Sequence, residues 1–255
     1  MEQLASHMKP DAFIIAGDIR QSGKRSEFEA ARPWFDSLGA AVISATGNHD
    51  TPVNHLPARM MAPFDRYERH LESMDIVGQI RNFDDGLVRI SAINSARGFQ
   101  GRINWADGVI DLRNPEDAPE KLSKEPGNAW RLLICHHRST AGACEIGGGE
   151  ATRRRSAEAV RSGKIDAIIT GYIHDAFTIR APRVRRPMVQ MGSGVLSTRL
   201  RTTRPSFCVI QIDGEHMVQD AIVIGPNGAE IRRNSASALN SGSETMAGTQ
   251  SLNAR

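Results

Sequence analysis

The pattern of apolar and polar positions in the first two-thirds of the chain predicts strands that alternate with helices. Short continuous apolar runs, typical of parallel strands buried on both faces, occupy Ala12–Ala16, Ala41–Ala45, Leu87–Ile93, Arg131–Cys135 and Ala167–Thr170. Apolar residues at helical spacing predict helices at Met1–Lys9, at Ser26–Leu38 with an interruption at Pro33, at Pro63–Ser73 and at Thr152–Arg161. This alternation is typical of an α/β fold.

The last third of the chain has a different pattern, because its apolar segments are joined by short turns. Met188–Met191, Phe207–Ile212 and Met217–Ile224 are predicted strands, and Asp213-Gly214 is a turn signal between the last two. From about Arg233 the chain is rich in Ser, Asn, Ala and Gly, which predicts a disordered tail. We therefore expect an α/β sandwich domain, two β-sheets flanked by helices, over residues 1–232, and a disordered tail over residues 233–255.

Composition narrows the class of protein. With 255 residues and 40% hydrophobic content, the chain can bury one sizeable core. No apolar run approaches the roughly 18 residues of a membrane helix, and the first residues contain no apolar signal-peptide core. The three cysteines are scattered, without a Cys-x-x-Cys pair, so we expect neither a zinc knot nor disulfides. These features favour a cytoplasmic protein with no membrane association.

Charge points weakly to an anionic ligand. The net charge is +3, and arginines concentrate at residues 153–155 and 180–204. Such a basic face is either solvated or attracts an anionic substrate. Aromatic residues make up only 5% of the chain, too few for the stacking platforms that single-stranded nucleic acids require. The composition therefore disfavours a nucleic-acid partner.

Four polar clusters each follow directly on a predicted buried strand. They are Gly17-Asp18, Gly47-Asn48-His49-Asp50, His136-His137 and Gly171-Tyr172-Ile173-His174. In open α/β sheets, ligands bind outside the carboxyl ends of the strands. We therefore predict that the four clusters converge on one rim of the sheet.

The side chains in these clusters are suited to metal binding. Carboxylate, amide and imidazole groups favour Mn, Fe or Zn over Ca. Two such ions about 3.5–4 Å apart can clamp the attacking and leaving oxygens of a displacement at phosphorus. Because two cations this close need a shared carboxylate, Asp18 is the candidate bridge. The sequence thus predicts a site for one or two divalent metal ions.

The order and spacing of the clusters resemble a known family. The patterns are GD-x4-G from Gly17 to Gly23, GNHD at Gly47–Asp50, an apolar strand ending in His136-His137, and G-x-x-H at Gly171–His174. They are similar to the calcineurin-like metallophosphoesterases, most of all to the bacterial cyclic-nucleotide phosphodiesterase branch. The resemblance spans roughly residues 10–212 and implies that family's sandwich fold and a metal-dependent phosphoester hydrolase, expected to be a phosphodiesterase.

The resemblance also implies metal ligands. Asp18 would bridge the two metals, and His174 would bind the first. Asn48 and His136 would bind the second metal. His137 stays open as an alternative to its neighbour, because adjacent strand residues point to opposite faces.

Catalytic roles follow from the same resemblance. His49 would contact the phosphate and protonate the leaving oxygen, and Asp50 would orient it by hydrogen bonding. The nucleophile would be a hydroxide held between the metals. Arg20 and Arg138 are either phosphate contacts or solvent-facing loop residues.

Two departures from the family pattern stand out. No Asp-x-His motif precedes Gly17-Asp18, so we expect a domain that lacks its first strand and two ligands of the first metal. Tyr172 stands where the family has the first histidine of Gly-His-x-His, and a neutral phenol is a poor ligand. The alternative to a hydrolase is therefore a catalytically impaired, phosphoester-binding domain of the same fold. The substrate, among which a cyclic nucleotide is one candidate, stays open, as does a homodimeric state.

Overall fold

The computed structural model of the chain shows how these segments pack. It describes residues 8–19, 24–52, 55–71, 73–74, 77–99, 108, 118–124, 128–137, 163–181, 188–196, 204–214, 216–226, 228–234 and 249–251. None of the helices in these ranges is long and apolar enough to cross a membrane.

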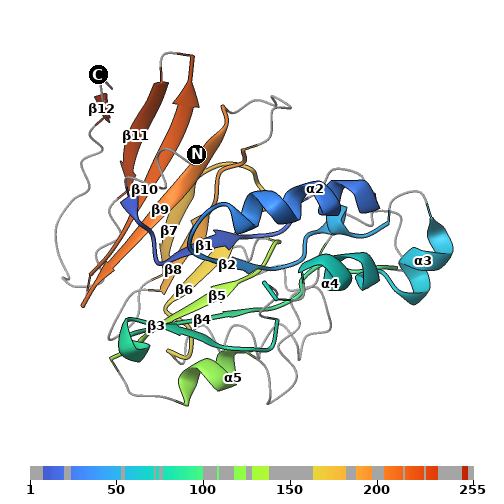
Figure 1. The fold of residues 1–255 in the computed structure, drawn as a ribbon. Coiled ribbons are helices and arrows are strands. Elements are labelled where there is room, and N and C mark those ends of the chain that lie inside the picture. Colours follow the sequence, from blue (N-terminus) through green and yellow to red (C-terminus); the bar gives the residue numbers. More distant parts are fainter. Residues whose placement is uncertain are drawn as a thin grey trace.

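The largest element is a six-stranded sheet with the order β3-β4-β5-β6-β8-β7 (Figure 1). Its strands are β3 Arg81–Phe83, β4 Val88–Ala92, β5 Trp130–Ile134, β6 Ala167–Thr170, β7 Phe177–Ala181 and β8 Met188–Gly192. The central strands β4, β5, β6 and β8 are parallel, while β3 and β7 pair antiparallel at the two edges. The carboxyl ends of the central strands therefore lie along one rim.

The remaining described strands form two further sheets. Strands β1 (Ala12–Ile15) and β2 (Ala41–Ser44) form a parallel pair. An antiparallel sheet has the order β12-β11-β10-β9 and consists of β9 Ser206–Asp213, β10 His216–Gly225, β11 Gly228–Asn234 and β12 Thr249–Ser251. The predicted second sheet is thus divided into two separate parts among the described residues.

The core lies between the six-stranded sheet and these two parts. Buried side chains from β2, β4, β5, β6, β8 and β10 pack together there, among them Ile43, Ile90, Ile134, Ile169 and Met217. A second cluster, which includes Leu133 and Ile168, covers the opposite face of the six-stranded sheet and packs against α5 (Ala118–Ser123). The molecule is therefore a layered α/β sandwich.

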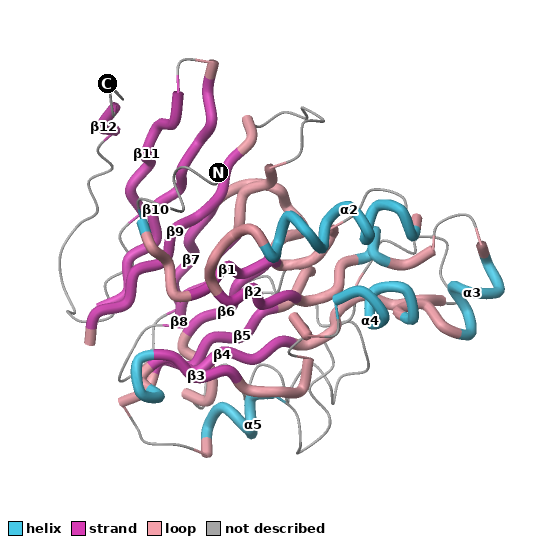
Figure 2. Tube along the Cα trace, in the orientation of Figure 1, coloured by secondary structure: helices cyan, strands magenta, loops and turns pink. Residues whose placement is uncertain are grey.

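Helices cover the outer faces of the sandwich (Figure 2). The described helices are α2 Arg25–Asp36, α3 Leu56–Met61, α4 Asp65–Leu71, α5 and the 3-10 turns η1 Asn48–Asp50 and η2 Asp84–Gly86. Phe28 and Phe35 of α2 are buried against Tyr67 and Leu71 of α4, over the β1–β2 pair.

The predicted interruption at Pro33 is wrong, because α2 runs unbroken through it. Proline removes one backbone donor from the helix. Pro33 faces solvent, however, and the burial of Phe28 on one side and Phe35 on the other holds the helix together.

The described elements otherwise confirm the main strand predictions. Strands β1, β2, β4, β5, β6, β8, β9 and β10 occupy the predicted apolar segments, and α4 lies within the predicted helix at Pro63–Ser73. Sequence reasoning missed β3, β7, β11, β12, α3 and α5. The predicted helix at Thr152–Arg161 and most of Met1–Lys9 lie outside the described residues. The predicted tail does too, apart from Arg233 and Asn234 at the end of β11 and Thr249–Ser251.

Candidate metal centre

The structure brings the four predicted polar clusters together at one end of the sandwich. The clusters follow β1, β2, β5 and β6. Nε2 of His136 lies 3.3 Å from Oδ2 of Asp18 and 3.1 Å from Oδ1 of Asn48. Nε2 of His174 lies 3.9 Å from the same Asp18 oxygen. Residues far apart in sequence thus meet because their strands end at a common rim.

Asp18 is at the centre of this arrangement. Its Oδ1 accepts a hydrogen bond of 2.9 Å from the backbone amide of His49, and its Oδ2 faces His136 and His174. Burial by itself raises the pKa of the Asp18 carboxyl, but hydrogen bonds from His136, His174 and the His49 amide together bring this pKa well below its ordinary value. Asp18 is therefore a fixed negative charge.

His136 presents a defined nitrogen to this charge. Its side chain is fully buried, and its Nδ1 lies 2.8 Å from the carbonyl oxygen of Ala16. Since a carbonyl oxygen can only accept, Nδ1 carries the hydrogen. In the neutral ring, Nε2 therefore points a lone pair at the oxygens of Asp18 and Asn48.

Asp18, Asn48 and Nε2 of His136 all present lone pairs to one another. Such an arrangement is stable only if a proton or a cation lies among them. Without a metal, a proton on Nε2 of His136 meets this need. Burial lowers the pKa of His136, but the hydrogen bond and negative charge of Asp18 outweigh it, so that the pKa is raised. A divalent cation meets the same need and matches the oxygen and imidazole donors. The donor set of Asp18, Asn48 and His136 thus fits a metal ion.

The amide oxygen of Asn48 is necessary for this fit. Among the described residues, no three His, Cys, Asp or Glu side chains are close enough together to hold a metal. Asn48 is 9% exposed, and its backbone carbonyl oxygen accepts a 2.7 Å hydrogen bond from Oγ1 of Thr51. The η1 turn that it opens therefore holds the amide in place beside His136.

Asp50 links the two loops that carry Asp18 and Asn48. Its side chain is fully buried, and Oδ2 accepts hydrogen bonds from the backbone amides of Gly47 at 2.8 Å and Asp18 at 3.0 Å. It thereby ties the loop after β2 to the loop after β1. His49 is half-buried at the mouth of the site, and the expectation that Asp50 orients its ring stays a prediction.

Two close backbone approaches explain the glycines in the motifs. Gly17 has φ 85°, and a Cβ there would lie 2.7 Å from Nδ1 of His136. A Cβ on Gly47 would lie 2.2 Å from Oδ1 of Asp18. Asp18 and His174 themselves have φ values of 54° and 62°, which non-glycine residues rarely adopt. Strain of this kind concentrates at functional sites.

His137 is directed away from Asp18. Its Nδ1 lies 2.9 Å from Oγ of Ser95, whose hydroxyl oxygen also accepts a 3.0 Å hydrogen bond from the His137 backbone amide. The geometry therefore places His136, and not its neighbour, in contact with Asp18 and Asn48. Ser95 was missed by sequence reasoning, although Asn94-Ser95 follows β4 closely, which is the same signal of polar residues after a buried strand.

Tyr172 stands over both histidines. Its ring lies edge-on to His136, with centroids 5.7 Å apart, and at 5.1 Å from His137. Its side chain remains 39% exposed. Tyr172 therefore covers the two imidazole rings with an aromatic side chain, at the position where the family pattern has a histidine. Arg20 and Arg138 lie outside the described residues.

Comparison with known proteins identifies the class. The model of the calcineurin-like phosphoesterase family matches residues 1–176. The chain therefore belongs to the calcineurin-like phosphoesterase family, which confirms the fold prediction. Its members are, in general, metal-dependent phosphoester hydrolases. A comparison with curated proteins finds no match.

Two of the solved structures that match illustrate the likeness. The protein TT1561 of Thermus thermophilus has a TM-score of 0.48 and 10% identity, over 76% of this chain and 80% of that one. Wild-type Vps29 complexed with zinc from Entamoeba histolytica has a TM-score of 0.38 and 11% identity, over 89% of this chain and 99% of that one. Because both scores lie below 0.5, the family assignment rests on the family model.

Proposed function

We propose that the protein is a metal-dependent phosphodiesterase that acts on a small phosphodiester at the rim around Asp18. The observation that supports this most directly is the convergence of Asp18, Asn48 and His136, with Nδ1 of His136 engaged by Ala16. A carboxylate oxygen and an amide oxygen that both lie within 3.3 Å of an imidazole nitrogen form a donor set suited to a cation. Membership of a phosphoesterase family adds the reaction class.

The site residues have different proposed roles in metal binding and proton transfer. Asp18, Asn48 and His136 would hold a manganese, iron or zinc ion, and His174 would support Asp18 from the other side. A divalent cation in such a site polarises phosphoryl oxygens and lowers the pKa of bound water. His49, at the mouth of the site, would donate the proton that the leaving oxygen requires.

Charge supports the proposed substrate class. A divalent cation bound beside Asp18 would make the site attractive to a phosphate diester. A cyclic nucleotide is the candidate that the sequence resemblance favours, and a bacterial cytoplasm is the expected setting. Arg180 and Arg204 are exposed on the described part of the basic face.

Hydrolysis of a chromogenic phosphodiester in the presence of Mn²⁺ tests the proposal. We expect activity in the parent, loss of activity to background in Asp18→Ala, and unchanged activity in Glu68→Gln, which removes an exposed carboxylate on α4. Circular dichroism of each variant controls for folding. Activity that survives in Asp18→Ala would contradict the assigned centre.

A second candidate function is phosphoester binding without hydrolysis. Tyr172 favours it, because this side chain covers His136 with an aromatic edge instead of adding a ligand. Calorimetry with Mn²⁺ and the same phosphodiester separates the two candidates. Metal and ligand binding without turnover would support the binding domain, and turnover would exclude it.

A further inference from the structure

Tyr172 is an exposed aromatic residue beside the candidate metal centre. Its ring contacts the rings of His136 and His137, with centroid distances of 5.7 Å and 5.1 Å, yet its side chain is 39% exposed. His136 in turn lies 3.3 Å from the carboxylate of Asp18. A single imidazole ring therefore separates Tyr172 from the carboxylate at the centre of the site.

The loop that carries Tyr172 fixes the position of its ring. The backbone amides of Gly171 and Tyr172 both donate to the carbonyl oxygen of His136, at 3.1 Å and 3.0 Å. The amide of His174 donates to the carbonyl oxygen of Gly171 and closes the turn. A Cβ at Gly171 would lie 2.4 Å from the carbonyl oxygen of Ala16, so the turn packs closely against the end of β1. Tyr172 thus belongs to a well-anchored segment of backbone.

The side chains under the ring are also held in place. His136 is fully buried, with Nδ1 engaged by the carbonyl oxygen of Ala16. His137 is 6% exposed, and its Nδ1 lies 2.9 Å from Oγ of Ser95. A group that is already ordered before its ligand arrives loses little conformational entropy on binding. Tyr172 therefore offers a preformed surface to a second planar ring.

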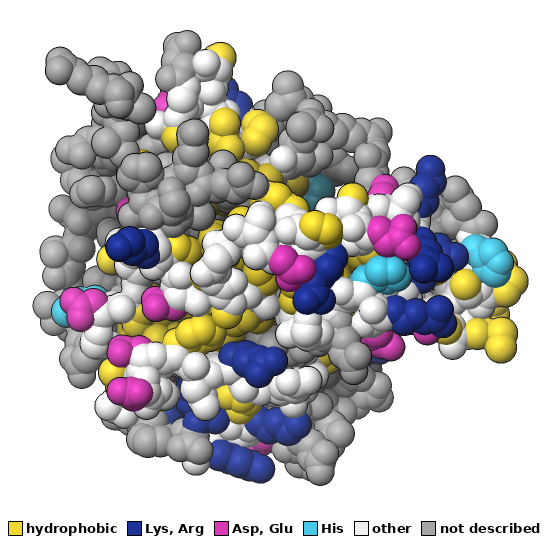
Figure 3. Space-filling model, viewed as in Figure 1, with side chains coloured by type: hydrophobic (Ala, Val, Ile, Leu, Met, Phe, Trp, Pro, Cys, Tyr) yellow, Lys and Arg dark blue, Asp and Glu magenta, His cyan; other side chains and the backbone are white. Residues whose placement is uncertain are grey.

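The exposed apolar side chains of α3 are of a different kind. Figure 3 shows apolar side chains gathered at the end of the molecule where Figure 1 places α3. Leu56, Met60 and Met61 are the exposed ones on this six-residue helix. Aliphatic side chains select a ligand by apolar area, whereas an aromatic ring prefers another ring in a stacked or edge-on arrangement. Tyr172 therefore carries more chemical information about a ligand than the surface of α3 does.

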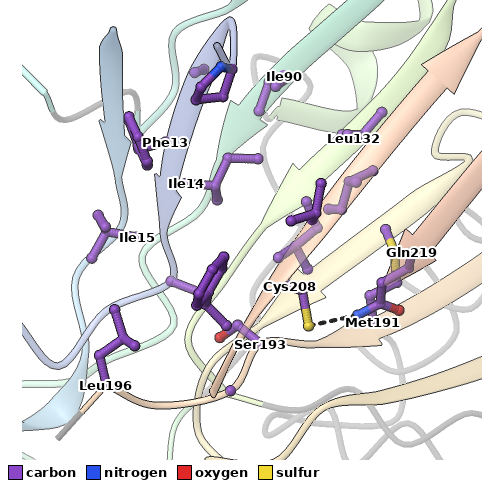
Figure 4. Close-up of a pocket in the computed structure, with 18 of the residues that line it drawn as sticks. Phe13, Ile14, Ile15, Ile90, Leu132, Met191, Ser193, Leu196, Cys208 and Gln219 are labelled. Carbon is purple, nitrogen blue, oxygen red and sulfur yellow. Dashed lines mark hydrogen bonds between the residues drawn. The ribbon is translucent and has the colours of Figure 1, made fainter. Parts of the chain in front are cut away.

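Tyr172 and the proposed proton donor lie on different sides of Asp18. The backbone amide of His49 donates to Oδ1 of Asp18. His136, against which Tyr172 packs, faces Oδ2 of the same carboxylate. His49 is also among the residues that line the pocket drawn in Figure 4, and Tyr172 is not. Because the leaving oxygen has to lie near His49, the group that stays on phosphorus is the one that can reach Tyr172.

We propose that Tyr172 is a specificity-determining residue, which stacks on a planar aromatic ring in the part of the phosphodiester that stays on phosphorus. The ring belongs to a nucleobase or to an aryl ester, since both present a π face of the same kind. This inference rests on the proposed function, because it requires the phosphate to lie at the rim around Asp18. It adds a substrate class, the phosphodiesters with an aromatic substituent, which the donor set of the centre does not distinguish.

Two phosphinates test the aromatic preference without turnover. Diphenylphosphinate and dicyclohexylphosphinate carry the same anionic group and are similar in size, and their P–C bonds are not hydrolysed. Calorimetry with Mn²⁺ present would compare their affinities for the parent, Tyr172→Phe and Tyr172→Leu. We expect the parent to bind diphenylphosphinate about tenfold more tightly than dicyclohexylphosphinate. Tyr172→Phe should keep this preference, because it keeps the ring, and Tyr172→Leu should lose it.

Nitration gives an independent measure of where the ligand lies. The chain has two tyrosines, and Tyr67 is fully buried, with its hydroxyl 2.6 Å from that of Ser44. Tetranitromethane should therefore modify Tyr172 first, which peptide mapping by mass spectrometry would show. Saturating diphenylphosphinate with Mn²⁺ should slow this modification about fivefold or more, because a stacked ring covers the exposed phenol. Dimethylphosphinate at the same occupancy should leave the rate nearly unchanged.

Three p-nitrophenyl diesters identify the source of the ring. They release the same leaving group, and the group that stays on phosphorus is methyl, phenyl or thymidin-5′-yl. A preference for the phenyl diester identifies an aryl ester, and a preference for the thymidine diester identifies a nucleobase. Either preference over the methyl diester should appear mainly in KM and fall about tenfold in Tyr172→Leu. Leu87→Ala, which truncates a side chain of similar exposure just before β4, is the matched control and should change none of these ratios.

The outcomes separate this inference from the proposed function. Mn²⁺-dependent binding of both phosphinates with equal affinity would overturn the inference alone. A preference that persists in Tyr172→Leu would do the same, because the aromatic contact would then lie elsewhere. Should that variant fail to fold by circular dichroism, an unchanged nitration rate in the liganded parent would overturn the inference. Binding of neither phosphinate and hydrolysis of no diester would overturn the candidate centre, and the proposed function with it.

Discussion

Strands β5 and β1 have similar sequences but different surroundings. Leu132, Leu133 and Ile134 of β5 are at most 2% exposed, because the strand lies inside a six-stranded sheet with side chains packed on both faces. Strand β1 reads AFII, pairs with one strand among the residues that the structure describes, and is half-buried at every position. An apolar run therefore predicts a strand that requires cover, and the arrangement of the sheets decides whether it is covered.

The contrast extends to the candidate metal centre, because each strand contributes a side chain at its carboxyl end. His136 follows β5 and is fully buried. Asp18 follows β1, remains 14% exposed and has a positive φ. The candidate centre is thus supported by a fully buried strand on one side and by a half-buried strand at the edge of its sheet on the other.

The largest expected effect tests the contrast in packing. Leu133→Ala should destabilise the protein by about 3 kcal/mol, since it leaves a cavity in a dense core. Val209→Ala, in half-buried β9, should cost about 1 kcal/mol or less. Urea unfolding of both variants measures the difference. Equal losses would mean that β9 is as well packed as β5.

The next effect tests which histidine after β5 binds the metal. His136→Gln should lower Mn²⁺ affinity by about 100-fold or more, while His137→Gln, which loses the hydrogen bond with Ser95 but leaves Asp18, Asn48 and His136 in place, should lower it about tenfold or less. Calorimetric titration with Mn²⁺ gives both values. The reverse order would place His137 in the centre.

A pair of glycine variants tests the strain at the end of β1. Gly17→Ala and Gly214→Ala both force alanine into a positive φ, which costs about 1–2 kcal/mol. At Gly17 the new Cβ also meets His136 at 2.7 Å, whereas at Gly214 nothing lies within 4 Å. Only Gly17→Ala should therefore lose Mn²⁺ affinity as well. Thermal unfolding and metal titration check the two parts, and an equal loss of affinity in both variants would contradict the close approach.

The smallest effect is the dependence of metal-free stability on pH. The pKa of His136 is raised in the folded protein. Its contribution is therefore complete below the unfolded pKa of about 6.5 and is lost as the pH rises through the folded value. The pKa of Asp18 is lowered, so its contribution is already complete above about pH 4 and stays constant in this window.

Melting temperatures in EDTA between pH 6 and 9 measure this dependence. We expect a decline toward alkaline pH in the parent and a flatter profile in His136→Gln. A parent profile that rises with pH would contradict the assigned direction.

The sequence by itself determined the strands that consist of continuous apolar runs, because such runs must be buried wherever they lie in the fold. Apolar runs located β1, β2, β4, β5, β6, β8, β9 and β10. Polar clusters at the ends of β1, β2, β5 and β6 identified Asp18, Asn48, His136 and His174 as neighbours, because parallel strands place their carboxyl ends at a common rim. The distances between these side chains agree with that reasoning.

Only the tertiary structure decided what depends on partners distant in sequence. Strands β3 and β7 read RNF and FTIRA, with no clear apolar run, and exist because they pair with β4 and β8. Which histidine faces Asp18 depended on the Ala16 carbonyl and on Ser95, 120 and 42 residues from their partners. The sequence analysis expected a domain without its first strand, but only the packing of the sheets showed that β1 and β9 are the described strands with an edge left without a described partner.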